Sequence, residues 1–178
     1  RRISCTDRVN GTTHWTYDAN SNVLSMSDAE SRESQFEYDT RNLQTKHIHP
    51  DHVFGSLPGD PDCGVVAFTY DGARRPATRV DQSGDTCTFQ YDRVNRLISR
   101  DYRLRQDAPN GQITDRDTFA YDRARRLLTA TSERYANACD LRYDQAGRLV
   151  KESLAIDGKT YEVASDYDTA NRRTGIHY

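Results

Sequence analysis

One dipeptide, Tyr-Asp, recurs along the whole chain and limits what the chain can fold into. The seven copies use seven of the eleven tyrosines and lie at Tyr17-Asp18, Tyr38-Asp39, Tyr70-Asp71, Tyr91-Asp92, Tyr121-Asp122, Tyr143-Asp144 and Tyr167-Asp168. Successive copies are 21, 32, 21, 30, 22 and 24 residues apart, so a unit of 21 to 24 residues is lengthened twice by insertions. Such a period is typical of repeat proteins, which stack one supersecondary unit on the next and use the assembled surface for function.

The residues before each tyrosine alternate in polarity. A large apolar residue stands two positions before the tyrosine in six of the seven copies: Trp15, Phe36, Phe68, Phe89, Phe119 and Leu141. The residue between them is mostly polar, and the last copy departs from the pattern with Ser165. A period of two predicts a strand that places the apolar residue and the tyrosine on one face and the polar residue on the other.

Turn-forming residues follow each tyrosine. An Asp side chain can accept hydrogen bonds from backbone N–H groups two residues further on, and a residue that tolerates positive φ can then close a hairpin loop. Four copies place such a residue three positions after the Asp: Asn42, Asn95, Gly147 and Asn171. The other copies have Ser21, Arg74 and Arg125 there, so their turns must use another geometry or accept strain. Next comes Arg or Asn and then an apolar residue that restarts a strand, as in Arg96-Leu97.

Further turn signals separate the units. They lie at Asp81–Asp85, Ala108–Gly111 and Asp157-Gly158, and the last of these is the strongest prediction of a hairpin outside the repeats. Residues Thr6–Gly11 resemble an eighth, degraded copy without its tyrosine. Since no window shows a helical period, the sequence predicts an all-β meander of roughly a dozen or more short strands.

The pattern apolar-x-Tyr-Asp-x-x-(Gly/Asn)-(Arg/Asn)-Leu resembles the Rhs, or YD-repeat, family, and is clearest in Phe89–Leu97 and Leu141–Leu149. That family includes bacterial Rhs toxins, the C components of insecticidal toxin complexes, and teneurins. The resemblance implies tandem β-hairpins in a meandering spiral sheet that forms an arc of a hollow shell. It also implies one repeat segment over residues 1–178, with about seven to eight repeats, an inserted loop at about 46–64 and no separate catalytic domain. We expect the chain to be a piece of a larger protein.

The function that the resemblance implies is structural and not enzymatic. The segment would help to enclose or present a toxin or effector, so its partners would be the remaining repeats and the cargo domain of the same polypeptide. The resemblance also implies a secreted or cell-surface protein. The alternative is an extracellular module that binds glycans or a surface protein, because aromatic faces stack on sugar rings and Arg can bond hydroxyls.

A zinc hydrolase is the least favoured alternative. The segment His47-Ile48-His49-Pro50-Asp51-His52 matches the H-x-H-x-D-H motif of the metallo-β-lactamase superfamily, in which a dinuclear zinc site activates water. Here the motif lies in a Pro- and Gly-containing insertion, and the flanking repeats exclude the layered α/β domain which that superfamily needs. Asp18–Asn22 imitates the start of a calcium loop but lacks the required Gly and Glu, since Val23 and Ala29 stand there. We therefore expect no metal site and no cofactor.

Composition narrows the remaining classes. The chain has 25 basic and 27 acidic residues, which gives no electrostatic footprint for nucleic acid, and it has no apolar run of the ~18–20 residues that a membrane helix needs. Leu, Ile, Val and Phe make up only 30 of 178 residues, which suits a single-layer sheet held by cross-strand aromatic pairs better than a thick core. The four cysteines, Cys5, Cys63, Cys87 and Cys139, show no C-x-x-C spacing, so disulfides and separate thiols both remain open.

Overall fold

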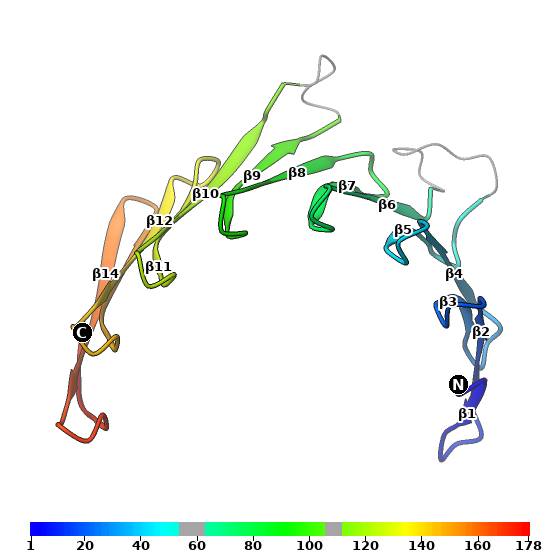
Figure 1. Ribbon diagram of the computed structural model, residues 1–178, viewed down its shortest axis with the longest axis horizontal. Helices are drawn as coiled ribbons and strands as arrows, with labels where there is room; N and C mark the ends of the chain where they lie inside the picture. The colour runs from blue at the N-terminus through cyan, green and yellow to red at the C-terminus, as the bar shows by residue number, and fades with distance from the viewer. Residues whose placement is uncertain (54–62, 106–111) are drawn as a thin grey trace. The chain divides into compact units, whose positions relative to one another are not determined.

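The described part of the chain is built from antiparallel strands. A computed structural model describes residues 1–53, 63–105 and 112–178, and these residues form fifteen strands and no helix (Figure 1). The strands follow one another in the sheet in chain order, β1 to β15, so each pairs with its sequence neighbours. The predicted all-β fold of tandem hairpins is thereby confirmed. Within the described ranges no helix is long and apolar enough to cross a membrane.

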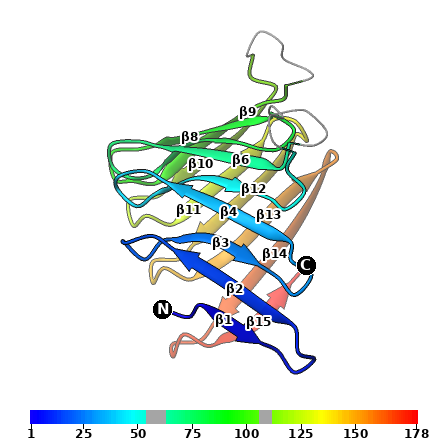
Figure 2. The same cartoon turned by 90° about the vertical axis from the view of Figure 1, so that its right-hand side faces the viewer.

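Two compact units can be distinguished, Arg1–Thr88 with Arg103–Gly111 and Phe89–Tyr102 with Gln112–Tyr178. The first unit contains seven complete strands (Figure 2): β1 Ser4–Thr6, β2 Thr12–Tyr17, β3 Val23–Ser27, β4 Glu33–Tyr38, β5 Gln44–Ile48, β6 Val65–Tyr70 and β7 Pro76–Val80. Strand β8, Thr86–Tyr91, and strand β9, Leu97–Arg103, cross the boundaries between the two ranges. The second unit holds the other strands: β10 Asp115–Tyr121, β11 Leu127–Ser132, β12 Asn137–Tyr143, β13 Leu149–Ile156, β14 Lys159–Tyr167 and β15 Arg173–His177.

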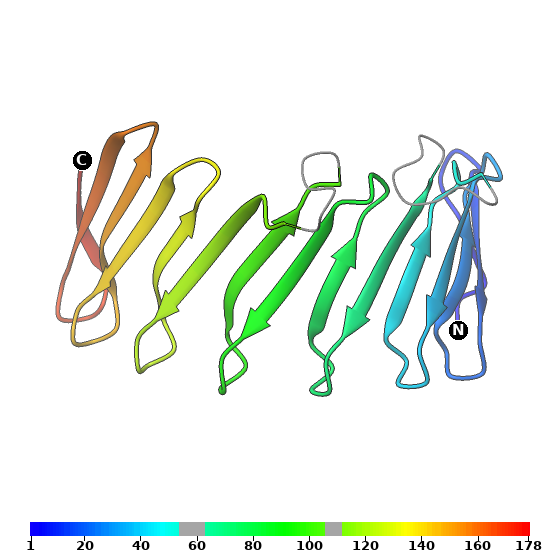
Figure 3. The same cartoon turned by 90° about the horizontal axis from the view of Figure 1, so that it is seen from above.

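Successive turns lie alternately at the two ends of the strands because neighbouring strands run in opposite directions. In each unit every Tyr-Asp turn connects the end of an even-numbered strand to the start of the following odd-numbered strand, so these turns all lie at the same end of the strands (Figure 3). The turn at Asp7 connects β1 to β2 and therefore lies at the other end of the strands in the first unit. It is closed like a Tyr-Asp turn, since Oδ1 of Asp7 accepts the N–H groups of Val9 and Gly11 at 2.8 and 2.9 Å.

The predicted alternation of faces is confirmed. Phe36 and Tyr38 are half-buried while Glu37 between them is exposed, and the same pattern holds in every other copy, including Ser165 to Tyr167. A bulge precedes each tyrosine in the six hairpins whose register is defined, which increases the local twist beside each turn. Among the described hydrophobic residues, Cys63, Val66 and Cys87 are the buried ones, and none of them is completely enclosed. The sheet is therefore stabilised mainly by contacts between neighbouring strands.

Turns outside the repeats follow local residue chemistry where they are described. The predicted hairpin at Asp157-Gly158 is confirmed, because Ile156 pairs with Lys159 and the two loop residues have φ of 50° and 73°. The insertion after β5 is closed by a 2.6 Å hydrogen bond from the N–H of His49 to the carbonyl of Gly64. Residues 54–62 of this insertion and the predicted turn at 108–111 lie outside the described residues.

Candidate functional site: the Tyr-Asp-Arg joints between hairpins

Each Tyr-Asp turn is closed by its own aspartate. In the turn after β8, the backbone N–H of Asp92 donates to the carbonyl of Arg96 at 2.9 Å, and the N–H of Asn95 donates to the carbonyl of Asp92 at 3.2 Å. The carboxylate oxygen Oδ1 of Asp92 accepts the N–H groups of Val94 and Arg96, both at 2.9 Å. These bonds define a three-residue hairpin loop in which the Asp side chain satisfies the backbone donors of the turn.

All seven turns adopt one geometry. The residue three positions after the Asp has positive φ in every copy, with values of 60–85°: Ser21, Asn42, Arg74, Asn95, Arg125, Gly147 and Asn171. The copies that have Ser or Arg at this position therefore accept the strain of a left-handed residue and do not change the turn. The sequence leaves open whether these turns use another geometry or accept strain, and the structure shows that they accept strain.

An arginine four positions after the Asp completes the turn in five copies. Its Nε donates to Oδ2 of the Asp at 2.6–2.7 Å in each: Arg75, Arg96, Arg126, Arg148 and Arg172. Arg41 replaces it in the Asp39 turn, and Asn22 bonds Asp18 in the first copy. The sequence shows this residue as Arg or Asn, but its ion pair with the Asp is not predicted from it.

These bonds stabilise the charged form of the repeat carboxyls. The backbone N–H four residues further on is the largest cause that lowers the pKa of six of them, and the neighbouring Arg lowers it further: Asp39, Asp71, Asp92, Asp122, Asp144 and Asp168. The pKa of Asp18 is lowered mainly by the side chain of Asn22. The repeat aspartates are thus turn-closing anions.

The same arginines reach the next hairpin. In the second unit Nη1 of Arg96 donates to the carbonyl of Asp122 at 3.0 Å, and Nη1 of Arg148 donates to the carbonyl of Asp168 at 2.9 Å. Arginine also covers the ring of the next repeat tyrosine in three pairs, with Cζ 4.5–4.9 Å from the ring centre: Arg96 over Tyr121, Arg126 over Tyr143 and Arg148 over Tyr167. Such a position allows a cation–π interaction.

The tyrosine hydroxyl returns the contact. Tyr121 donates to the carbonyl of Leu97 at 2.9 Å and Tyr167 donates to the carbonyl of Leu149 at 2.9 Å, in each case to the residue after the arginine of the preceding turn. In the first unit Tyr70 bonds the carbonyl of Gln44 in the same way at 2.8 Å. We call this set of contacts a hairpin joint. In a joint, the arginine of one copy contacts the tyrosine ring and the aspartate carbonyl of the following copy, and the tyrosine hydroxyl of the following copy bonds the carbonyl after that arginine. The sequence predicts a ladder of aromatic side chains, and at these joints each tyrosine ring instead packs against an arginine.

A buried ion pair in the second unit has no counterpart in the repeat pattern. Asp101 on β9 is 3% exposed and accepts two hydrogen bonds from Arg116 on β10, at 2.7 and 3.1 Å. Gln90 on β8 donates to the same carboxylate at 3.3 Å. These residues lie 11 and 15 positions apart, so no local motif could have indicated that they meet.

The histidine motif of the insertion is divided among different surroundings. His47, at the end of β5, stacks on Phe36 with ring centres 4.8 Å apart, and its ring lies 4.0 Å from that of His49. Burial and the neighbouring His49 lower the pKa of His47. Asp51 and His52 follow β5 in the chain. Over residues 1–53, 63–105 and 112–178, no three His, Cys, Asp or Glu side chains are arranged to hold a metal ion.

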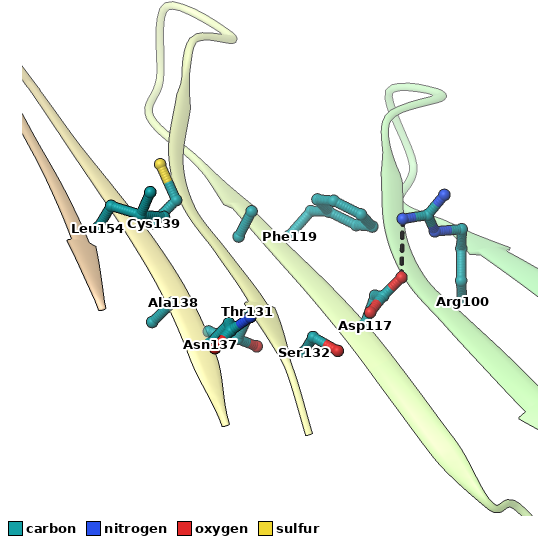
Figure 4. Close-up of a pocket in the computed structure, with 10 residues that line it drawn as sticks. Arg100, Asp117, Phe119, Thr131, Ser132, Asn137, Ala138, Cys139 and Leu154 are labelled. Atoms are coloured by element: carbon teal, nitrogen blue, oxygen red, sulfur yellow. Dashed lines mark ion pairs between the residues drawn. The ribbon is translucent and has the colours of Figure 1, made fainter. Parts of the chain in front are cut away.

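A small hollow opens on the tyrosine-bearing face of the second unit (Figure 4). Its volume is about 190 Å³, and Phe119, Ala130, Cys139 and Leu154 form its apolar wall. Burial, with Glu152 and Asp140 nearby, raises the pKa of the Cys139 thiol, so this wall is uncharged. On the polar side Asp117 accepts the guanidinium of Arg100 at 2.7 Å and the hydroxyl of Tyr102 at 3.0 Å.

Comparison with known proteins agrees with the repeat geometry. The family described as RHS Repeat matches residues 17–53, which hold the first two Tyr-Asp copies and the turns after them. This match agrees with the resemblance of the Tyr-Asp pattern to the Rhs, or YD-repeat, family. No curated protein has a sequence that matches this chain.

Solved structures share the fold of this chain over almost its whole length. The Tc holotoxin pore of Photorhabdus luminescens carrying the TccC3 D651A mutation aligns with a TM-score of 0.74 and 16% identity, over 93% of this chain. TcdB2-TccC3 aligns with a TM-score of 0.60 and 14% identity over 92%, and TcdB2-TccC3-Cdc42 with 0.53 and 16% over 92%. The 178-residue chain spans 9–10% of the length of those chains, and at these identities the likeness concerns the fold.

Proposed function

We propose that this Rhs chain forms part of a shell that encloses another part of the same polypeptide, a toxin or effector. The observation that carries the proposal is the use of the repeated residues. Arg96 bonds the Asp92 carboxylate of its own turn and the Asp122 carbonyl of the next, so the recurring side chains join hairpins into a continuous wall. The proteins that share the fold include a holotoxin and the TcdB2-TccC3 assembly, which supports a role in toxin delivery.

The geometry argues against the repeat side chains as catalytic groups. Catalysis by carboxylates needs groups that converge in different environments, so that one can act as an acid and the other as a base. The repeat aspartates instead share one environment, in which the backbone N–H four residues further on and mostly an arginine hold each carboxylate. We therefore propose a scaffold without enzymatic activity in these residues.

Glycan binding receives less support from the same contacts. An exposed tyrosine face is needed to stack on a sugar ring, but an arginine covers one face of each of Tyr121, Tyr143 and Tyr167. A shell requires these contacts, whereas a sugar site would have to break them. Under the proposal the partners are the remaining repeats and the cargo, and the protein is exported to act in a secreted or surface-bound form.

Limited proteolysis of the full polypeptide that carries residues 1–178 tests the proposal. We expect the enclosed part to resist protease until the shell opens. The double variant Arg96→Ala, Arg148→Ala removes two joints and should make the enclosed part cleavable at lower denaturant concentration. Arg93→Ala, at an exposed position in the same turn as Arg96, serves as the control. Rapid cleavage of the cargo in the folded wild-type protein would contradict enclosure.

A further inference from the structure

The end of strand β5 in the first unit carries two histidine rings packed on a repeat phenylalanine. His47 pairs with Phe36 across β4 and β5 and with Val66 across β5 and β6, so its ring lies on the tyrosine side of the sheet. The ring of Phe36 stacks on it with centres 4.8 Å apart and planes 20° apart, and the ring of His49 lies 4.0 Å away. A titratable group is thus part of the packing between three strands.

The surroundings of His47 suit a neutral ring. Its Nε2 atom is buried and has no hydrogen-bond partner among the described residues. Both nitrogens of a charged imidazolium carry a hydrogen, so protonation would leave a buried donor without an acceptor, which is costly. Burial and then the neighbouring His49 lower the pKa of His47 from its ordinary value of 6.5. Geometry and electrostatics therefore both oppose a charge on this ring while it stays packed.

The packed strands offer no carboxylate that would compensate such a charge. The charged residues of β4 and β5 alternate with the tyrosine side and so belong to the other face of the sheet: Glu33, Glu37 and Lys46. Strand β6 has no acidic or basic residue. Tyr38 and Tyr70 of the flanking strands share the face of His47 but are uncharged near neutral pH. In the turn after β5, Asp51 is exposed and His52 is half-buried.

His47 lies where a tight turn leaves the sheet. The N–H of His49 donates to the carbonyl of Gly64 at 2.6 Å, and the N–H of His52 donates to the carbonyl of His49 at 3.1 Å. The turn packs closely against Gly64, because a Cβ at that position would lie 2.8 Å from the backbone N of His52 and 2.9 Å from Oδ1 of Asp51. A movement of the His47 ring away from its neighbours would therefore loosen a closely packed turn.

We propose that the packing of His47 on Phe36 and His49 is a pH-sensitive switch, in which protonation of His47 opens the end of β5 and the turn His49–His52. In the open form water reaches Nε2, and the ring takes up a proton from solvent. The open form binds this proton more tightly than the closed form, so opening is favoured as the pH falls below 6.5, and the effect levels off below the lower pKa of the closed form. This switch goes beyond the proposed role of the repeats as a wall, and its test does not depend on whether the protein encloses cargo.

The test is amide hydrogen exchange of the full polypeptide that carries residues 1–178, measured by mass spectrometry with a metal chelator present. After correction for the intrinsic exchange rate, the protection of β5, β6 and the turn His49–His52 should fall at least threefold between about pH 7.5 and about pH 5.5. Strands β12 and β13 are the internal reference and should change little. His47→Phe keeps a ring against Phe36 but cannot be protonated, so its protection should be equal at both pH values. His14→Phe, at an exposed histidine on β2, should behave like the wild type.

Two glycine variants test whether this turn is the part that opens. Gly64→Ala places a methyl group where the turn packs and should lower the protection of the same segments at least threefold already at about pH 7.5. Gly72→Ala is the matched control, because no atom lies within 4 Å of the added Cβ, and it should leave that protection unchanged.

The quantity that decides is the ratio of protection at the two pH values within one protein. It therefore remains valid if His47→Phe is less protected at both, and His47→Gln should give the same ratio of one. Equal protection of the wild type at both pH values, the wild-type pH dependence in His47→Phe, or unchanged protection in Gly64→Ala would each overturn the proposal.

Discussion

At the scale of single residues, the Tyr-Asp pair works together with an arginine whose position the sequence pattern shows but whose contacts it does not predict. The Asp role in the turn could be predicted, because Asx chemistry acts within a few residues. The role of Arg96 could not, because its side chain also contacts Tyr121 and Asp122, more than twenty residues further along. A periodic residue can be recognised from one sequence, but its partner in the next repeat cannot.

The tyrosine hydroxyl should contribute a measurable part of each joint. Tyr121→Phe removes the hydrogen bond to the carbonyl of Leu97 and keeps the ring under Arg96. We expect the free energy of unfolding to fall by about 0.5–1.5 kcal/mol, the usual net value of such a bond. Tyr135→Phe, at a tyrosine that is 61% exposed, should change it little. Urea denaturation of both variants measures the difference, and equal effects would contradict the joint.

The repeat carboxyls should make the fold acid-sensitive. Their pKa values are lowered from 3.8 in the folded state, so the folded protein binds fewer protons than the unfolded chain in acid. This stability is fully present above the unfolded pKa and is lost as the pH falls through the lower folded pKa values. We expect the contribution of the repeat carboxyls to the free energy of unfolding to be level above about pH 5 and to decline below about pH 4. Asp92→Asn should flatten that decline, as measured by urea titrations across this range; an unchanged slope would argue against the assignment.

At the scale of the hairpin, the period of two predicts which residues face the tyrosine side, and the structure agrees in every copy. The strain at the third residue after each Asp could not be decided from sequence, because Ser21, Arg74 and Arg125 are poor left-handed residues. The hydrogen bonds to the Asp carboxylate and the pairing of the flanking strands outweigh that cost. Local propensity therefore gives way to the repeated turn.

Relief of this strain should stabilise the protein. Arg125 has φ of 68° and an exposed side chain, so Arg125→Gly removes the left-handed penalty of about 1–2 kcal/mol. Greater freedom of Gly in the unfolded chain offsets about 0.5–1 kcal/mol of it. We expect a net gain of roughly 0.5 kcal/mol in unfolding free energy by thermal or urea denaturation. Ala124→Gly, in the same turn with negative φ, should be destabilising, and a loss of stability in both variants would refute the strain argument.

The two faces of a strand should differ in their response to truncation. Leu141 is half-buried on the tyrosine side and Arg142 is exposed on the other. Leu141→Ala should lower the free energy of unfolding by about 1–2 kcal/mol, less than the ~2–5 kcal/mol of a closed core because the sheet has a single layer. Arg142→Ala should remain within about ±0.5 kcal/mol. The pair Tyr91 and Gln90 is a poorer comparison, since Gln90 also bonds the buried Asp101. Similar melting shifts for Leu141→Ala and Arg142→Ala would contradict the buried-face pattern.

At the scale of the whole chain, neighbouring strands in the sheet are also neighbours in sequence, and this simplicity is why the fold could be predicted from one periodic dipeptide. What could not be predicted depends on single departures from the repeat. The hollow lies beside Ala130, which pairs with Phe119 at a position where the other described hairpins have larger residues. The ion pair of Asp101 with Arg116 is formed by residues that do not belong to the repeat pattern. In a sheet where each strand contacts only its sequence neighbours, the repeat predicts the contacts that all copies share. Contacts made by residues outside the repeat can be identified only once the pairing of the strands is known.

The last turn of the sheet carries one half of a joint. Arg172 bonds Asp168 like the other arginines, but its side chain is 80% exposed, compared with 25–32% for Arg96, Arg126 and Arg148. In the sequence no Tyr-Asp copy follows it within these 178 residues. Strand β15 is the last in the sheet order, so its outer backbone groups are open to another strand, and edges of this kind drive association.

We expect the isolated chain to associate through this edge as its concentration rises. A charge on an edge strand opposes such pairing, so Ile176→Lys on β15 should shift the protein toward monomer in sedimentation velocity. Leu24→Lys on β3 is a matched control, because both residues are 41% exposed but β3 is paired on both sides. Arg172→Ala should weaken association as well, since the half joint loses the group that would cover an incoming aromatic ring. If Leu24→Lys reduced association as much as Ile176→Lys, the contact would lie on a sheet face and the open edge would not be its cause.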